Sequence, residues 1–109
     1  LTRVKNFLAA GYPSMFGFTV YNLGNDKGEF AFPGSGDSVQ GGHAVVAVGF
    51  DDNRKIGKDK GALKIRNSWG TDWGEGGYGW LPYSYVEAGL ADDFWSLFKS
   101  EYVKTGQFD

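Results

Sequence analysis

The apolar residues of this chain fall into short runs that are separated by turn-forming and glycine-rich stretches. Within Leu1–Ala10 the apolar positions follow a helical spacing, and Gly11 and Pro13 then form a stop signal. Because so little sequence precedes this stop, we expect the chain to begin inside a larger element. The run Ser14–Tyr21 is aromatic and β-branched and is closed by turn residues, which predicts a buried strand.

Two segments in the middle of the chain are predicted to pair as neighbouring strands. Ala44–Phe50 is continuously apolar, as in a buried strand, and Ala62–Arg66 alternates as a partly exposed strand does. The charged stretch Asp51–Gly61 between them is interpreted as a hairpin-like connection. The segment Asn22–Gly42 is rich in Gly, Pro, Asp, Asn and Ser and is long for a plain connection, which indicates an ordered loop with a function.

The last third of the chain alternates between turn residues and short strand candidates. Gly70–Gly79 contains five glycines, Tyr78–Leu81 is typical of a short strand, and Pro82 opens a turn or a single helical turn. Asp93–Lys99 is the final strand candidate. About five short strands with one N-terminal helix predict a mostly β fold, a curled antiparallel sheet or half-barrel that forms a single domain over residues 1–109.

Composition and charge narrow the function classes. With 41% hydrophobic and 17% aromatic residues, a chain of 109 residues can bury a core without disulfides, which excludes disorder. A formal net charge of −2 argues against nucleic-acid binding, and no run approaches the ~20 apolar residues of a membrane span. The chain has no cysteine, so it offers neither a thiol nucleophile nor a thiol ligand for a metal. We expect no cofactor, no bound metal, no nucleic-acid partner and no membrane contact.

His43 is the only histidine, and it stands after Gly41 and Gly42 at the start of the most apolar strand. A histidine at a strand end is more often structural than catalytic. The two glycines favour a functional role, because residues without Cβ let a substrate backbone approach an imidazole at the edge of a cleft.

Asn67 follows the second of the two strands that are predicted to pair. Alone, an asparagine here is typical of a turn. If the strands form a hairpin, however, His43 and Asn67 lie at the same end of the sheet and within hydrogen-bond reach. An amide oxygen beside an imidazole N–H fixes the tautomer, so that the other ring nitrogen can face a nucleophile. Trp69 could cover this hydrogen bond, although Trp69 and Trp73 fit an ordinary aromatic core equally well on spacing alone.

Two segments resemble the histidine and asparagine segments of the papain-like cysteine peptidases. They are GGHAVVAVGFDD (Gly41–Asp52) and ALKIRNSWGTDWGEGGYGWLPYSYV (Ala62–Val86), together about a third of the chain. The shared features are the His-Ala step, the NSWG block, the second WG and the GGYG that follows. LPYSYV and the DFW near the end bring the chain closest to the microbial members. The resemblance implies the β-rich, right-hand domain of a two-domain enzyme that hydrolyses peptide bonds.

The resemblance also implies a role for each matching residue. His43 would be the partner of the catalytic thiolate, Asn67 its orienting residue, and Trp69 the shield over their contact. Four further residues would bind substrate: Gly42 and Ala44 beside the pocket for the substrate side chain, Gly17 (or Phe18) at the wall of that pocket, and Trp73 on the leaving-group side of the scissile bond.

The chain departs from the family in what it lacks. Members carry the nucleophilic cysteine, and a glutamine that helps to hold the oxyanion, on an N-terminal and mostly helical domain. Gln40 and Gln107 are present, but neither precedes a cysteine. The resemblance therefore implies a C-terminal half that supplies histidine and asparagine and is inactive without the Cys-bearing domain. Its expected partners are that domain and a peptide or protein substrate. Self-association would hide the apolar face that is left bare in the isolated chain.

Two other functions are compatible with parts of the sequence. A non-catalytic binding or regulatory module could retain the peptidase scaffold without its chemistry. The presence of His43, Asn67 and Trp69 together argues against this alternative, because a scaffold that lost its activity long ago would not be expected to retain all three. A carbohydrate-binding sandwich with exposed tryptophans would explain the aromatic residues but would leave the GGHA segment unexplained.

Overall fold

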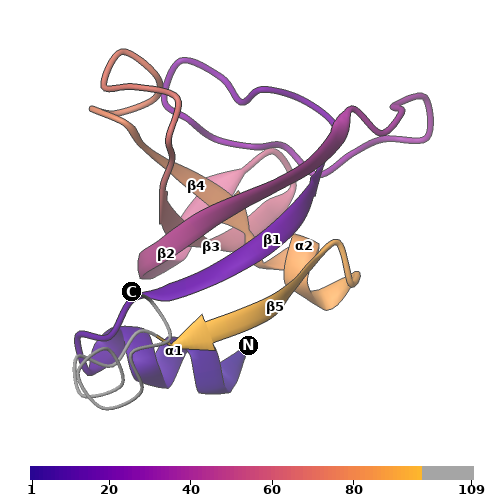
Figure 1. The fold of residues 1–109 in the computed structure, drawn as a ribbon. Coiled ribbons are helices and arrows are strands. Elements are labelled where there is room, and N and C mark those ends of the chain that lie inside the picture. Colours follow the sequence, from indigo (N-terminus) through magenta and orange to yellow (C-terminus); the bar gives the residue numbers. More distant parts are fainter. Residues whose placement is uncertain (97–109) are drawn as a thin grey trace.

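Five strands of the computed structural model form one antiparallel sheet in the order β4-β3-β2-β1-β5 (Figure 1). The structure describes residues 1–96 of the chain. Its elements, in chain order, are α1 Thr2–Ala9, β1 Ser14–Val20, β2 Gly41–Ile56, β3 Asp59–Arg66, β4 Tyr78–Pro82, α2 Tyr83–Glu87 and β5 Ala91–Ser96. The predicted mostly β fold of five strands with an N-terminal helix is confirmed, and the sheet stays open, with β4 and β5 at its two edges.

The central hairpin is longer than the sequence pattern predicted. The interpretation of Asp51–Gly61 as a connection is wrong for most of its length, since β2 continues to Ile56 and β3 begins at Asp59. The buried side chain of Ile56, 5% exposed, holds the extended end of the hairpin against the fold, while its charged neighbours face solvent. The helical turn expected after Pro82 is α2. Of the strand expected at 93–99, residues 97–99 lie outside the described residues.

Alternation along the strands places the core on one face of the sheet. The core residues come from all five strands, both helices and the loop between β1 and β2: Leu8, Phe16, Phe18, Val20, Phe30, Val45, Ala47, Leu63, Ile65, Leu81, Tyr85 and Ala91. Burying each large apolar side chain of this kind contributes roughly 1.5–3 kcal/mol. The core therefore fixes which side chains of β1, β2 and β3 face outward.

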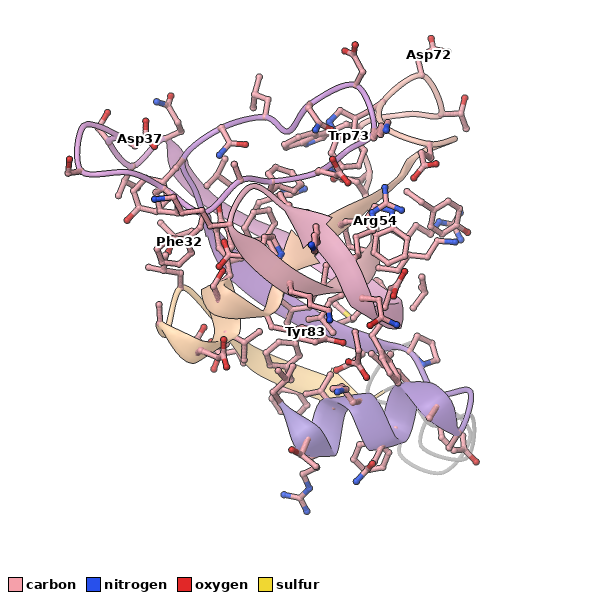
Figure 2. The ribbon with its side chains drawn as sticks, turned by 180° about the vertical axis from the view of Figure 1, so that it is seen from behind. Phe32, Asp37, Arg54, Asp72, Trp73 and Tyr83 are labelled. Carbon is pink, nitrogen blue, oxygen red and sulfur yellow. The ribbon has the colours of Figure 1, made fainter. Side chains whose placement is uncertain are left out.

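Helix α1 is attached to the sheet by an ion pair at the end opposite the long loops (Figure 1). Lys5 Nζ lies 2.7 Å from Asp52 Oδ1, and the Tyr83 hydroxyl donates to the same oxygen over 2.7 Å. The hydrogen bond from Lys5, followed by that from Tyr83, lowers the pKa of the Asp52 carboxyl. Tyr83 accordingly lies close to α1 (Figure 2).

The long loop between β1 and β2, residues 21–40, is ordered by contacts with β4. Phe30 donates its backbone N–H to the Trp80 carbonyl over 3.0 Å, and Trp80 donates to the Gly28 carbonyl over 2.8 Å. Gly28 has φ +74, and a Cβ there would lie 2.8 Å from the Cα of Gly79. Only glycine lets the loop approach the sheet this closely. The loop therefore forms part of the framework at the end of the sheet where His43 lies.

Candidate active site

The histidine and the asparagine singled out in the sequence meet at one end of β2 and β3. The register pairs Val46 with Arg66, so that Asn67, directly after β3, lies alongside the first residues of β2. His43 Nε2 is 2.7 Å from Asn67 Oδ1. The prediction that strand pairing brings the two side chains within hydrogen-bond reach is confirmed.

A second donor on the same oxygen sets the direction of this hydrogen bond. The backbone N–H of Ser68 donates to Asn67 Oδ1 over 2.8 Å, so the oxygen of the amide, and not its NH2, faces these partners. His43 therefore donates from Nε2, and a neutral ring keeps its lone pair on Nδ1. Asn67 is only 8% exposed, and its Nδ2 is buried without a hydrogen-bond partner among residues 1–96. Nδ1 is thus the ring atom that can take up a proton.

The indole of Trp69 lies over the imidazole. The two rings are stacked, with centroids 4.9 Å apart and planes 19° from parallel. On another side, the buried ring of Phe18 meets the imidazole edge-on at 6.0 Å. These rings exclude water from the His43–Asn67 hydrogen bond, and a lower local dielectric strengthens it. Trp69 itself is 38% exposed, so its outer surface is open to solvent.

Phe30 is a supporting residue that the sequence reasoning missed. Its side chain is fully buried, and its ring contacts Trp69 at 6.2 Å, Trp73 at 5.6 Å and Phe18 at 5.1 Å between centroids. Phe30 therefore supports the tryptophan that covers His43 and the phenylalanine that borders it. The only available signal was an isolated apolar residue in an otherwise polar and glycine-rich loop.

Trp73 lies beside Trp69 at the loop end of the sheet (Figure 2). The two indoles meet edge-on with centroids 5.4 Å apart, and Trp73 Nε1–H donates to the Leu23 carbonyl over 2.9 Å. Trp73 thus joins the loop after β3 to the loop after β1. Its expected place on the leaving-group side of a scissile bond stays a prediction.

An open hollow of about 460 Å³ adjoins His43. It is bordered by the glycine and alanine positions that the sequence assigned to substrate binding, Gly17, Gly42 and Ala44, as well as by Phe18, Thr19, Leu90 and Asp92. A Cβ on Gly42 would meet no atom within 4 Å, and one on Gly17 would make only an ordinary contact of 3.8 Å. The fold therefore does not need these glycines for packing, and their lack of side chains keeps the hollow open. Sequence reasoning missed Asp92, which lies on β5 far along the chain.

Neither a metal-ligand cluster nor a membrane-spanning helix is found in the part of the chain that the structure describes. Residues 1–96 contain no group of three or more His, Cys, Asp or Glu side chains arranged to hold a metal ion. The helices within this range are also too short and too polar to cross a membrane.

The chain as a whole is similar to known cysteine proteases and peptidase-like proteins. The model of the papain family cysteine proteases matches residues 6–96. An uncharacterized peptidase C1-like protein of Acanthamoeba polyphaga mimivirus is 40% identical over 103 residues, which cover 89% of this chain and 31% of that protein. A cathepsin B-like protein of Giardia intestinalis is 43% identical over 84 residues, which cover 69% of this chain and 24% of that protein.

Solved structures of cysteine proteases share the fold. Xylellain, a cysteine protease from Xylella fastidiosa, is 46% identical with a TM-score of 0.68, over 82% of this chain and 33% of xylellain. Procathepsin B from Trypanosoma congolense is 25% identical with a TM-score of 0.62, over 88% of this chain and 32% of that protein. The chain thus spans about a third of the length of these proteases.

Proposed function

The chain belongs to the papain family of cysteine proteases, and we propose that it supplies the histidine and the asparagine of a Cys-His-Asn peptidase site. The observation that carries this proposal is the His43–Asn67 hydrogen bond of 2.7 Å, which leaves Nδ1 of the imidazole as the proton acceptor. The thiol must come from a segment outside these 109 residues, because they contain no cysteine. On its own the chain is inactive.

In the proposed mechanism, His43 Nδ1 takes the proton of the incoming thiol, which gives a thiolate and an imidazolium. The thiolate attacks the carbonyl carbon of the scissile peptide bond and forms a tetrahedral intermediate. As the C–N bond breaks, the imidazolium returns its proton to the leaving amine, and an acyl-thioester remains. His43 then takes a proton from water, whose oxygen attacks the thioester carbon. The C–S bond breaks, the imidazolium returns the proton to the sulfur, and the thiol is regenerated with the carboxylic acid product. Asn67 holds the ring plane throughout.

We propose that the hollow beside His43 receives a side chain of the peptide substrate. Gly42 and Ala44 flank the histidine along β2, and Gly17 on β1 leaves room opposite Ala44. Trp73 supports the leaving-group side. A volume of about 460 Å³ has space for a large side chain.

We further propose that the sheet face opposite the core binds the Cys-bearing domain. The register sets one residue of each strand side by side across this face, and we call these five residues the outer row: Trp95, Met15, Val46, Arg66 and Tyr78. The side chain of Trp95 is 64% exposed and that of Met15 is 41% exposed. Adjacent apolar side chains over several strands are typical of an interaction surface.

The outer row is continuous with the candidate site. A hollow of about 200 Å³ on this face is lined by Met15, Val46 and Arg66 and extends to Asn67. A domain that covered the row would therefore reach the His43–Asn67 pair. Arg66 is exposed, so the complementary partner would be apolar with a carboxylate opposite the guanidinium. In the isolated chain, a second copy covers the row instead.

Substituting the centre of the outer row is expected to weaken this self-association. Val46→Lys places a second cation beside Arg66 in the middle of the apolar surface, and it should raise the dimer dissociation constant by roughly tenfold or more. Val39→Lys is the matched control, because Val39 is 60% exposed on the long loop. Sedimentation over a range of concentrations measures both variants. A wild-type chain that stays monomeric at high concentration, or equal behaviour of the two variants, would contradict the proposed surface.

A chimera tests the proposed function. In it, this chain replaces the third of xylellain that it matches, so that the rest of xylellain provides the cysteine. We expect the chimera to hydrolyse a fluorogenic peptide and the isolated chain not to do so. A folded chimera without activity would favour the alternative of a non-catalytic module on the peptidase scaffold. Activity of the isolated chain would show that the proposed mechanism is wrong.

A further inference from the structure

The guanidinium of Arg54 joins the two loops that build the aromatic cover over His43. Arg54 Nε donates to Glu29 Oε2 over 3.0 Å, and Nη2 donates to Glu75 Oε1 over 3.5 Å. The guanidinium also stacks over the indole of Trp80, 4.3 Å from its centroid. Arg54 lies near the end of β2 that is remote from His43, and Figure 2 shows it below Trp73. The side chain of Arg54 is 23% exposed, so its pair with Glu29 is partly shielded from solvent, whereas the side chain of Glu75 is 56% exposed.

On one side, Arg54 fixes the segment that carries Phe30. Glu29 directly precedes Phe30 in the chain, and its side chain is 15% exposed. Asn25 Nδ2 donates to Glu29 Oε1 over 2.9 Å. This hydrogen bond, and then that from Arg54, lowers the pKa of the Glu29 carboxyl, so the group stays ionised at neutral pH. Because the side chain of Glu29 is bound to Arg54, the next residue, Phe30, keeps its ring in the core, in contact with Trp69 and Phe18.

On the other side, Arg54 fixes the glycine-rich loop between β3 and β4. Glu75 Oε1 also accepts a hydrogen bond from Trp80 Nε1 over 3.1 Å, and the Glu75 backbone N–H donates to the Tyr78 carbonyl over 2.9 Å. The same loop is closed by the Asn67 backbone N–H, which donates to the Gly77 carbonyl over 3.0 Å. The loop therefore begins at the residue that binds His43 and is anchored beside Arg54.

We infer that Arg54 is a positioning residue, which keeps Trp69 seated over the His43–Asn67 hydrogen bond by clamping both loops at once. The functional meaning of this clamp rests on the proposed peptidase site, but the clamp itself is a property of this chain. Glycine residues at 70, 74, 76 and 77, all with positive φ, give the loop little stiffness of its own. A planar guanidinium that bridges two carboxylates supplies a fixed geometry that a flexible ammonium does not.

The test compares Arg54→Met with Lys5→Met in the isolated 109-residue chain. Lys5 is the matched control, because its side chain is 28% exposed and its ion pair with Asp52, also on β2, holds α1 and neither of the two loops. NMR follows the exchange of the His43 Nε2–H proton with solvent at a temperature where both variants are folded. We expect exchange to be about tenfold faster in Arg54→Met and unchanged in Lys5→Met. Arg54→Lys, which keeps the charge but not the fork, should exchange at an intermediate rate.

Glu75→Gln is the second variant, for use if Arg54→Met does not fold. It weakens only the contact between Arg54 and the glycine-rich loop and leaves the contact with Glu29 in place. It should speed exchange of the His43 Nε2–H proton by a smaller factor than Arg54→Met. Equal exchange in wild type, Arg54→Met and Glu75→Gln would overturn the clamp while leaving the proposed peptidase site intact. Faster exchange in Arg54→Met, combined with an inactive chimera, would instead retain the clamp and reject the peptidase function.

Discussion

In the xylellain chimera, replacing His43 with alanine is expected to lower kcat/KM for a fluorogenic peptide by about 10⁴-fold or more. In the proposed mechanism the imidazole takes the thiol proton, because its Nδ1 is left free by the hydrogen bond of Nε2 to Asn67. Without it, the thiol stays protonated and the leaving amine receives no proton. The protein should still bind peptide, because Gly17, Gly42 and the rest of the hollow are unchanged.

Asn67→Ala should cost less, about 10- to 10²-fold in kcat/KM, because the imidazole remains and loses only its fixed tautomer and ring plane. Asn6→Ala, at an exposed position on α1, is the control and should keep full activity. If His43→Ala retained more than about a tenth of the activity, or if Asn67→Ala were the more damaging change, the assigned roles would be wrong.

Phe30→Ala is expected to cause the largest loss of stability among single changes around the site. The ring is fully buried and contacts Phe18, Trp69 and Trp73, so its removal leaves a cavity beneath the cover. We expect the free energy of unfolding to fall by about 3–4 kcal/mol, because transfer and cavity terms add. For a domain of this size the Tm would fall by roughly 15 °C.

The matched control for Phe30→Ala is Phe32→Ala on the same loop. Phe32 is 39% exposed and contacts the ring of Tyr85 at 5.6 Å, so its loss should cost about 1 kcal/mol or less. Thermal unfolding followed by circular dichroism measures both variants. Similar losses for the two would contradict the role of Phe30 as the support beneath Trp69.

The sequence was sufficient for the central pair of the site because that pair depends on strand geometry. Ala44–Phe50 and Ala62–Arg66 each have a strand pattern, and a short-range hairpin brings the residues next to them together without knowledge of the rest of the fold. The length of the hairpin was misjudged for a related reason. Its charged end at Asp51–Gly61 lacks an apolar alternation, and pairing there depends on the burial of Ile56.

The supports of the site could not be predicted because they depend on the path of loops. Phe30 and Arg54 are separated by the rest of the long loop and by most of β2, and nothing local indicates that Glu29 connects them. Asp92 reaches the hollow only because β5 pairs with β1, which is a contact between the two ends of the chain. Such long-range neighbours are fixed by tertiary packing, and neither hydrophobic period nor propensity encodes them.

The most direct test of the central claim is the pH dependence with which iodoacetamide alkylates the nucleophilic cysteine of the chimera. A cysteine paired with histidine, as in papain itself, has a pKa of roughly 3–4, whereas a free thiol has a pKa of about 8.5. We predict fast alkylation down to about pH 5 when His43 is present, and a loss of reactivity below about pH 8 in the His43→Ala chimera. Identical pH profiles for the two proteins would contradict the claim, because the thiolate would then owe its stability to a group other than His43.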